Sequence, residues 1–222
     1  LLSIVISTQF LEQSPDGYAP AVYKPPAAQK GTADMDWKEM IKTPIFYVML
    51  LLLTSGAFSG MMIISQASAM AQGMIGMTAI AASAAVSILA LFNALGRIAA
   101  GYISDKIGRI NTLITACILC IVGMLCLYFS ADGQQMLFYT GICIVGVSFG
   151  SFMGVYPGFT ADQFGARNNS VNYGIMFIGF ALAGYFGPQM RRSVYESTGG
   201  YQNAFLIACG LNIAGIILTV LY

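Results

Sequence analysis

Apolar residues fill six long stretches of the chain, and short polar segments separate them. Each stretch holds about twenty residues with almost no charge, the length that a helix needs to cross about 30 Å of hydrocarbon. An apolar run at 1–9 is too short for a full span, and residues 10–43 form a polar connector rich in proline. The pattern predicts an all-α membrane protein, a bundle of six transmembrane helices. These predicted spans cover residues 44–72, 78–103, 110–130, 136–159, 171–190 and 201–222.

Composition favours a lipid bilayer over water as the solvent. The chain is 57% hydrophobic and 9% charged, whereas a soluble domain is about 25% charged. A net charge of +1 without a long basic run argues against nucleic acid as a partner. The cysteines all lie in apolar stretches, and no histidine is available to complete a zinc site with Cys117 and Cys120. We predict neither a metal nor another cofactor.

Basic residues are distributed unevenly between the two sides of the predicted bundle. Connectors on one side hold seven of the ten Lys and Arg residues, and the opposite side holds Arg191 and Arg192. Because Lys and Arg concentrate in cytoplasmic loops, the connector at 10–43 is predicted to be cytoplasmic. The chain is accordingly expected to be a multi-pass protein of the cytoplasmic (cell) membrane.

Small residues recur inside the spans, for example Gly141, Gly146, Gly150 and Gly154 in the fourth. In lipid, small residues let helix backbones approach closely. We therefore interpret these glycines as helix-packing residues.

Arg97 is the charged residue that the hydropathy pattern places deep inside a span. A charge at the bilayer centre costs at least about 2.5 kcal/mol, so such a residue usually has a function. Asn93 precedes it by four positions and projects from the same helix face. Because a guanidinium binds a carboxylate through two parallel hydrogen bonds, the pair predicts a site for a small organic anion. The alternative is an Arg97 side chain that extends to the cytoplasmic interface.

Catalytic arrangements are missing from the spans. No Asp or Glu lies inside them, and the sequence has no histidine. Without a nucleophile and a base, we predict that the chain is not an enzyme. For the same reason, a proton-carrying group for coupled transport would have to lie outside this sequence.

The segment from Gly101 to Arg109 resembles the G-x-x-x-D-[RK]-x-G-[RK] loop of the major facilitator superfamily. The alternative interpretation is a simple polar turn. The resemblance implies a conformational gating loop that breaks and re-forms as two six-helix halves rock. Its motif residues are Gly101, Asp105, Lys106, Gly108 and Arg109.

Further stretches at 10–18, 93–97, 156–165 and 172–175 resemble the oxalate/formate antiporter branch, which includes monocarboxylate carriers. The resemblance implies that the chain is the C-terminal half of such a transporter, with the N-terminal six-helix half as its missing partner. Residues 1–9 would then be the end of helix six, 10–43 the cytoplasmic connector, and 44–222 the C-terminal bundle.

The resemblance also implies roles for single residues. Arg97 would grip the substrate carboxylate, and Asn93 would assist. Oxalate carriers of the branch have a lysine where this chain has Phe180, so we expect a monocarboxylate such as lactate, formate or pyruvate ahead of oxalate/formate exchange. For the apolar candidates, core packing is an equal alternative. The candidates for the cavity wall are Phe149, Met153, Phe177, Phe180 and, more weakly, Gln66.

Two other functions stay open at this point. One is a carrier of the same superfamily for uncharged or cationic solutes, in which Arg97 is structural. The other is a membrane receptor that binds a ligand without moving it. Competition by short carboxylates and measurement of flux separate these alternatives from an anion carrier.

Overall fold

The computed structural model of the chain describes residues 34–221, which are helical apart from short connections. Six of the helical segments are long and apolar enough to cross a membrane, with α8 and α9 counted together. The predicted all-α bundle with six spans is therefore confirmed. The predicted helix end at 1–9 and residues 10–33 of the connector lie outside the described residues. The helices are α2 (Trp37–Met40), α3 (Pro44–Ile64), α4 (Ala67–Ile75), α5 (Ala79–Ile107), α6 (Arg109–Phe129), α7 (Gln135–Phe164), α8 (Asn169–Met176), α9 (Ile178–Thr198) and α10 (Gln202–Leu221).

Capping residues set the start of the first helices. The hydroxyl of Thr43 accepts a hydrogen bond from the N–H of Phe46, and Pro44 occupies the first turn of α3. Helix α2 begins with a capping box, in which Asp36 and Glu39 each accept a hydrogen bond from the other's backbone N–H. This helical turn lies where the polar pattern predicts an irregular connector. Its signal is the Asp-x-x-Glu spacing, which hydropathy does not register.

Two of the spans are interrupted. The first breaks at Ser65 and Gln66, between α3 and α4, where this polar pair interrupts the apolar pattern for only two residues. The fifth breaks at Phe177, between α8 and α9, and α9 then continues to Thr198. This end lies beyond the predicted end at residue 190, because Arg191 and Arg192 interrupt the apolar pattern without interrupting the helix.

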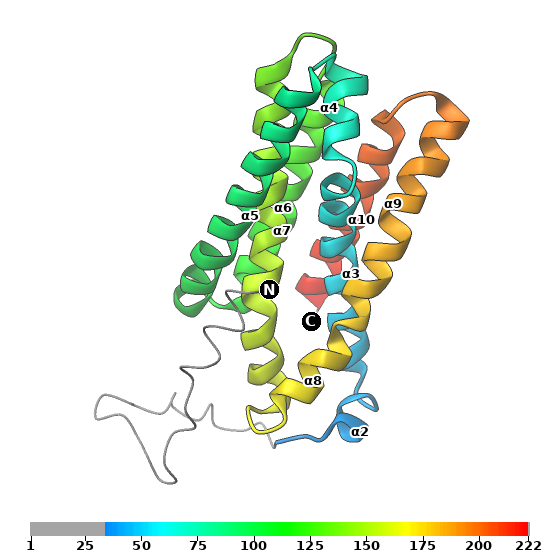
Figure 1. The fold of residues 1–222 in the computed structure, drawn as a ribbon. Helices are drawn as coiled ribbons and strands as arrows, with labels where there is room; N and C mark the ends of the chain where they lie inside the picture. The colour runs from blue at the N-terminus through cyan, green and yellow to red at the C-terminus, as the bar shows by residue number, and fades with distance from the viewer. Residues whose placement is uncertain (1–33, 222) are drawn as a thin grey trace, which may run out of the picture. The chain divides into compact units, whose positions relative to one another are not determined.

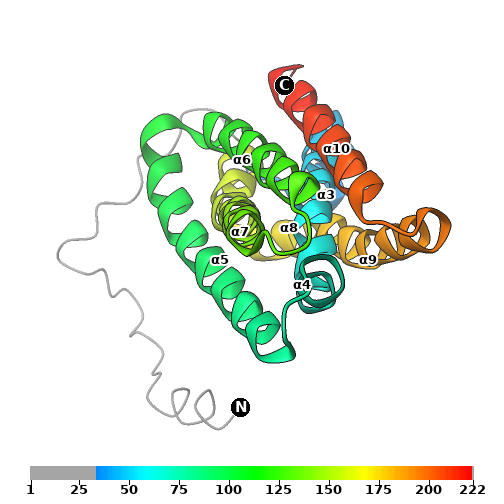
Figure 2. The same cartoon turned by 90° about the horizontal axis from the view of Figure 1, so that it is seen from above.

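Helix α7 lies in the middle of one group of helices, with α5 on one side and α6 on the other (Figure 2). Helices α3, α9 and α10 form a second group, which meets the first where α3 packs on α7 and α10 packs on α6. Helices α4 and α8 lie near opposite ends of the bundle (Figure 1). The buried side chains form one apolar cluster toward each end, one containing Met70 and Phe138 and the other Phe152 and Tyr156.

Glycines on α7 allow α5 to approach closely. A Cβ atom at Gly150 would overlap the backbone carbonyl of Asn93, and one at Gly154 would overlap that of Arg97. Gly146 lies against α5 in the same way, and Gly141 against α6. The packing interpretation of these four glycines is confirmed, and two of them hold the backbone of the predicted anion-binding residues.

Buried polar side chains link neighbouring helices within each of the two groups. The Asn212 amide on α10 donates a hydrogen bond of 2.7 Å to the Ser59 hydroxyl on α3. The Ser148 hydroxyl on α7 donates a bond of 2.7 Å to the carbonyl of Ala116 on α6. Interhelical hydrogen bonds of this kind stabilise helix association in lipid, where no hydrophobic effect draws helices together.

Candidate functional site

The structure joins Arg97 and Asn93 on one face of α5. Arg97 Nε donates a hydrogen bond of 3.3 Å to Asn93 Oδ1. Arg97 lies ten residues before Ile107, the end of α5, which corresponds to about 15 Å along the axis. The backbone of Arg97 therefore lies within α5 and not in the loop that follows it. The hydrogen bond uses one edge of the guanidinium, and its Nη groups remain available to a ligand.

Arg97 has no acidic partner in the described part of the chain. The three salt bridges within residues 34–221 involve Arg109 and Arg192 instead. Arg97 is exposed in this bundle, and only 22% of the most apolar stretch of α5 is buried, compared with 61% for α7. Because an arginine facing hydrocarbon is unfavourable, the open face of α5 needs a polar partner or a water-filled space.

An aromatic row lies across α8, α9 and α7. Ring centroids are 5.1 Å apart for Tyr173 and Phe177, 4.8 Å for Phe177 and Phe180, and 6.1 Å for Phe180 and Phe149. The row therefore leads from α8 to the core of the bundle at Phe149. Tyr173 is absent from the sequence-based candidates, although its spacing from Phe177 places both on one helix face.

The residues predicted to line the substrate cavity differ in how deeply they are buried. Phe149 and Met153 are buried in one of the core clusters, whereas Phe177 and Phe180 are half-buried at its edge. Gln66 is half-buried at the break between α3 and α4, and its side chain forms no capping hydrogen bond. None of the described hydrogen bonds joins Gln66 to Arg97. Contact of these residues with a substrate stays a prediction.

A cavity of about 320 Å³ lies elsewhere, between α3, α9 and α10. Leu51, Phe58, Leu182 and Leu211 are among the residues that line it, so it is mostly apolar. It does not include Arg97. Within residues 34–221, no three His, Cys, Asp or Glu side chains lie close enough together to hold a metal ion.

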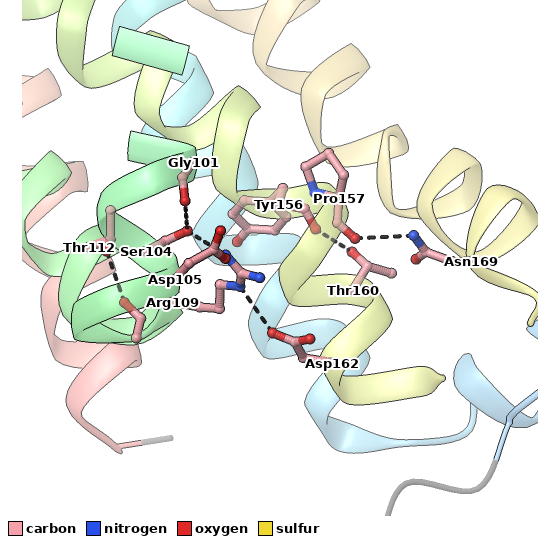
Figure 3. Close-up of polar contacts among 11 residues, drawn as sticks. Gly101, Ser104, Asp105, Arg109, Thr112, Tyr156, Pro157, Thr160, Asp162 and Asn169 are labelled. Atoms are coloured by element: carbon pink, nitrogen blue, oxygen red, sulfur yellow. Dashed lines mark hydrogen bonds and ion pairs between the residues drawn. The ribbon is translucent and has the colours of Figure 1, made fainter. Parts of the chain in front are cut away.

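The predicted gating loop centres on Arg109, the first residue of α6 (Figure 3). Its guanidinium donates to Asp105 at 2.6 Å, to Asp162 at 3.0 Å, and to the hydroxyl of Ser104. These bonds tie the ends of α5, α6 and α7 together. Gly108 adopts a φ of 91°, which favours glycine over other residues.

Two other loop residues lie beside the Arg109 cluster. The carbonyl of Gly101 accepts a hydrogen bond from Ser104, so Gly101 contributes its backbone. The ammonium of Lys106 lies 4.3 Å from the ring centroid of Tyr102 and takes no part in the described salt bridges.

Asp162 is the partner of Arg109 that sequence reasoning missed as a site residue. It lies in Gly158-x-x-x-Asp162-x-x-Gly165, which repeats the glycine and aspartate spacing of the gating loop. The backbones also match, because Gly165 has φ 89° and ψ 155°, and Gly108 has φ 91° and ψ 156°. Self-similarity of the two segments is the signal that could have identified Asp162 from the sequence.

The second of these turns carries a further contact. The carboxylate of Asp34 accepts a hydrogen bond of 3.2 Å from the backbone N–H of Arg167. The carbonyl of Met35 accepts one bond of 3.1 Å from each of the Asn168 and Asn172 side-chain amides. The segment before α2 is thus fixed to the turn between α7 and α8, on the same end of the bundle as Arg109.

Comparison with known proteins gives a consistent assignment. An uncharacterized MFS-type transporter, YhjX of Escherichia coli, is 29% identical over 154 residues, which is 68% of this chain and 38% of YhjX. The oxalate:formate antiporter of Oxalobacter formigenes is 29% identical over 179 residues, 78% of this chain and 41% of the antiporter. The MFS transporter asaE of Aspergillus flavus is 26% identical over 196 residues, 86% of this chain and 43% of asaE.

The chain therefore spans about two fifths of the length of these relatives. The family model described as Major Facilitator Superfamily matches residues 1–188, most of the chain. Together with the six apolar spans and the Arg109 loop, this match shows that the chain belongs to the major facilitator superfamily.

Proposed function

We propose that the chain forms the C-terminal six-helix half of a secondary carrier that moves a small organic anion across the cytoplasmic membrane. The single observation that carries this proposal is Arg97, a permanent cation inside a span that has no acidic partner in residues 34–221. An anionic substrate supplies the missing charge. The similarity to the antiporter of Oxalobacter formigenes, named for oxalate and formate, supports an anion as the substrate class.

The substrate is a monocarboxylate such as lactate, formate or pyruvate in this proposal. One guanidinium matches one carboxylate, and Asn93 fixes the orientation of its fork through the 3.3 Å bond to Nε. Phe180 lies in the aromatic row with Phe177 and Phe149 rather than adding a second cation. An apolar wall beside the guanidinium excludes water and strengthens the attraction between the two charges.

Transport follows alternating access, in which this bundle and the N-terminal half rock about a site near the midplane. The broken spans at Gln66 and Phe177 fit this mechanism, because discontinuous helices supply the binding sites of many carriers. The Arg109 cluster fixes one end of α5, α6 and α7, so the three helices move as one unit during the rocking.

The proposal is tested with the complete protein in liposomes, by uptake of radiolabelled lactate, formate and oxalate. Replacing Arg97 by Gln removes the charge and its paired hydrogen bonds, so lactate uptake at low concentration is expected to fall about tenfold or more. Arg97→Lys keeps the charge without the planar fork and is expected to give an intermediate rate.

Arg167→Gln is the matched control, because Arg167 is exposed on the turn between α7 and α8 and contacts Asp34 through its backbone. Its uptake is expected to equal that of the parent. Unchanged uptake in both Arg97 variants would remove Arg97 from the mechanism. A carrier for uncharged or cationic solutes would be insensitive to short carboxylates, and a receptor would bind lactate without moving it.

A further inference from the structure

Arg191 is a buried cation that the hydropathy pattern does not single out. The predicted fifth span ends one residue before it, but α9 continues to Thr198 and carries Arg191 within the helix. The residue is only 8% exposed, and its Nε is buried without a hydrogen-bond partner among residues 34–221. A buried guanidinium N–H without an acceptor is unfavourable in an apolar interior, so this unpartnered Nε points to a ligand.

The surroundings of Arg191 are apolar and aromatic. Its Cζ lies 5.3 Å from the ring centroid of Tyr201, and Tyr195 stacks on Tyr201 at 4.7 Å. The neighbouring residues Met190 and Val194 pack against a hydrophobic cluster. None of the described salt bridges includes Arg191, and Glu196 pairs with Arg192 instead. The cation–π contact covers one face of the guanidinium and leaves its edge donors available.

The position of Arg191 on α9 relates it to the aromatic row of the proposed substrate site. Arg191 follows Phe180 by eleven positions, close to three full turns, so both project from the same side of the helix. Gly187, one turn earlier, packs against the carbonyl of Phe58 near the end of α3. The hydroxyl of Tyr201 lies near Gly73 of α4. Arg191 is therefore close to the broken first span, at the end of the bundle opposite Arg109.

We propose that Arg191 is a second anion-binding residue, which receives the carboxylate of the substrate at this end of the route. The proposal rests on the proposed function and extends it. The edge of the Arg191 guanidinium donates to the carboxylate, while the ring of Tyr201 packs on its face and fixes the orientation of the guanidinium plane. The anion then moves from Arg191 to Arg97, so the two arginines bind the same small carboxylate in sequence.

The test uses the complete protein in cells or right-side-out vesicles, with lactate as the probe applied from outside. Arg191→Gln is expected to raise the half-saturating external lactate concentration about tenfold or more, as for the loss of a charge-assisted bond. Half-saturation measured from the inside, in inverted vesicles, is expected to change much less. Arg192→Gln is the matched control, because the Arg192 side chain is 76% exposed and paired with Glu196.

Equal external half-saturation in Arg191→Gln and Arg192→Gln would overturn the inference, and so would a loss of protein level without a change in half-saturation. Should Arg191→Gln fail to fold, Arg191→Lys decides the matter. It keeps the charge without the fork, and a value equal to that of the parent contradicts anion binding. A parent that transports no carboxylate overturns the proposed function together with this inference, whereas an active parent with an indifferent Arg191 overturns the inference alone.

Discussion

At the scale of single residues, Phe180 is the position at which the aromatic row is apolar instead of positively charged. Its ring stacks on Phe177 at 4.8 Å and on Phe149 at 6.1 Å, so the position is apolar on both sides. A lysine here would place a second cation on the side of α9 that faces Phe149. The charge of the substrate should then change with the charge of this residue.

We therefore expect Phe180→Lys to strengthen competition by oxalate and to weaken uptake of lactate. The physical reason is that two cations attract a dianion more strongly than a monoanion. Measurement of lactate uptake against increasing oxalate tests this expectation. Phe180→Leu, which removes the ring without adding charge, is the control. An identical oxalate dependence in both variants would mean that position 180 does not face the substrate.

Single residues also mark the limit of what could be predicted from the sequence. Arg97 and Asn93 could be paired in advance because their four-residue spacing fixes their direction on a helix. Arg191 could not be recognised as buried, because it stands next to Arg192 and the pair ends the apolar pattern. The sequence does not show that Arg191 is buried and Arg192 is exposed. Asp162 could not be assigned to Arg109, because the contact joins positions 53 residues apart.

At the scale of elements, the contact between α5 and α7 determines where Arg97 lies. Gly150 and Gly154 face the backbone of Asn93 and Arg97 without intervening side chains. Close backbone packing of this kind depends on small residues, since lipid supplies no hydrophobic force between helices. Loss of a glycine is therefore expected to move Asn93 and Arg97 as well as to weaken the bundle.

Gly150→Ala is expected to destabilise the protein by about 1–3 kcal/mol, as is typical for overpacking. The added methyl group would overlap the carbonyl of Asn93. Thermal unfolding of the complete protein in detergent measures the effect. Gly210→Ala on α10 is the control, because a Cβ atom there meets nothing within 4 Å. Equal unfolding temperatures for the two variants would contradict the packing argument.

Hydropathy predicts the number and approximate position of the spans because each one is long and apolar. The same measure cannot predict their interruptions. Ser65 and Gln66 interrupt the apolar pattern of the first span too briefly to end it, and Phe177 is itself apolar. These breaks depend on backbone geometry and tertiary packing, which a sum over side-chain polarity does not contain.

At the scale of the whole molecule, the Arg109 cluster fixes one end of the first group of helices. Its two carboxylates differ in environment, because the side chain of Asp105 is 65% exposed and that of Asp162 is 28% exposed. Ion pairs are screened less by solvent as they become buried. The bond to Asp162, which joins α6 to α7, should therefore contribute more to stability.

Asp162→Asn is accordingly expected to lower the unfolding temperature of the complete protein more than Asp105→Asn does. Glu196→Gln, which breaks the exposed pair with Arg192, serves as the control and should change little. Thermal unfolding of the three variants in the same detergent gives the order. An effect of Asp105→Asn that exceeds that of Asp162→Asn would show that the exposed pair dominates.

Gly108 is the only residue between the last residue of α5 and the first residue of α6. A connection of one residue couples the two helices closely, so a tilt of one helix must also tilt the other. Any tilt of α5 that carries Arg97 with it would therefore also tilt α6. In the proposed carrier, binding of an anion at Arg97 would then change the position of α6 as well.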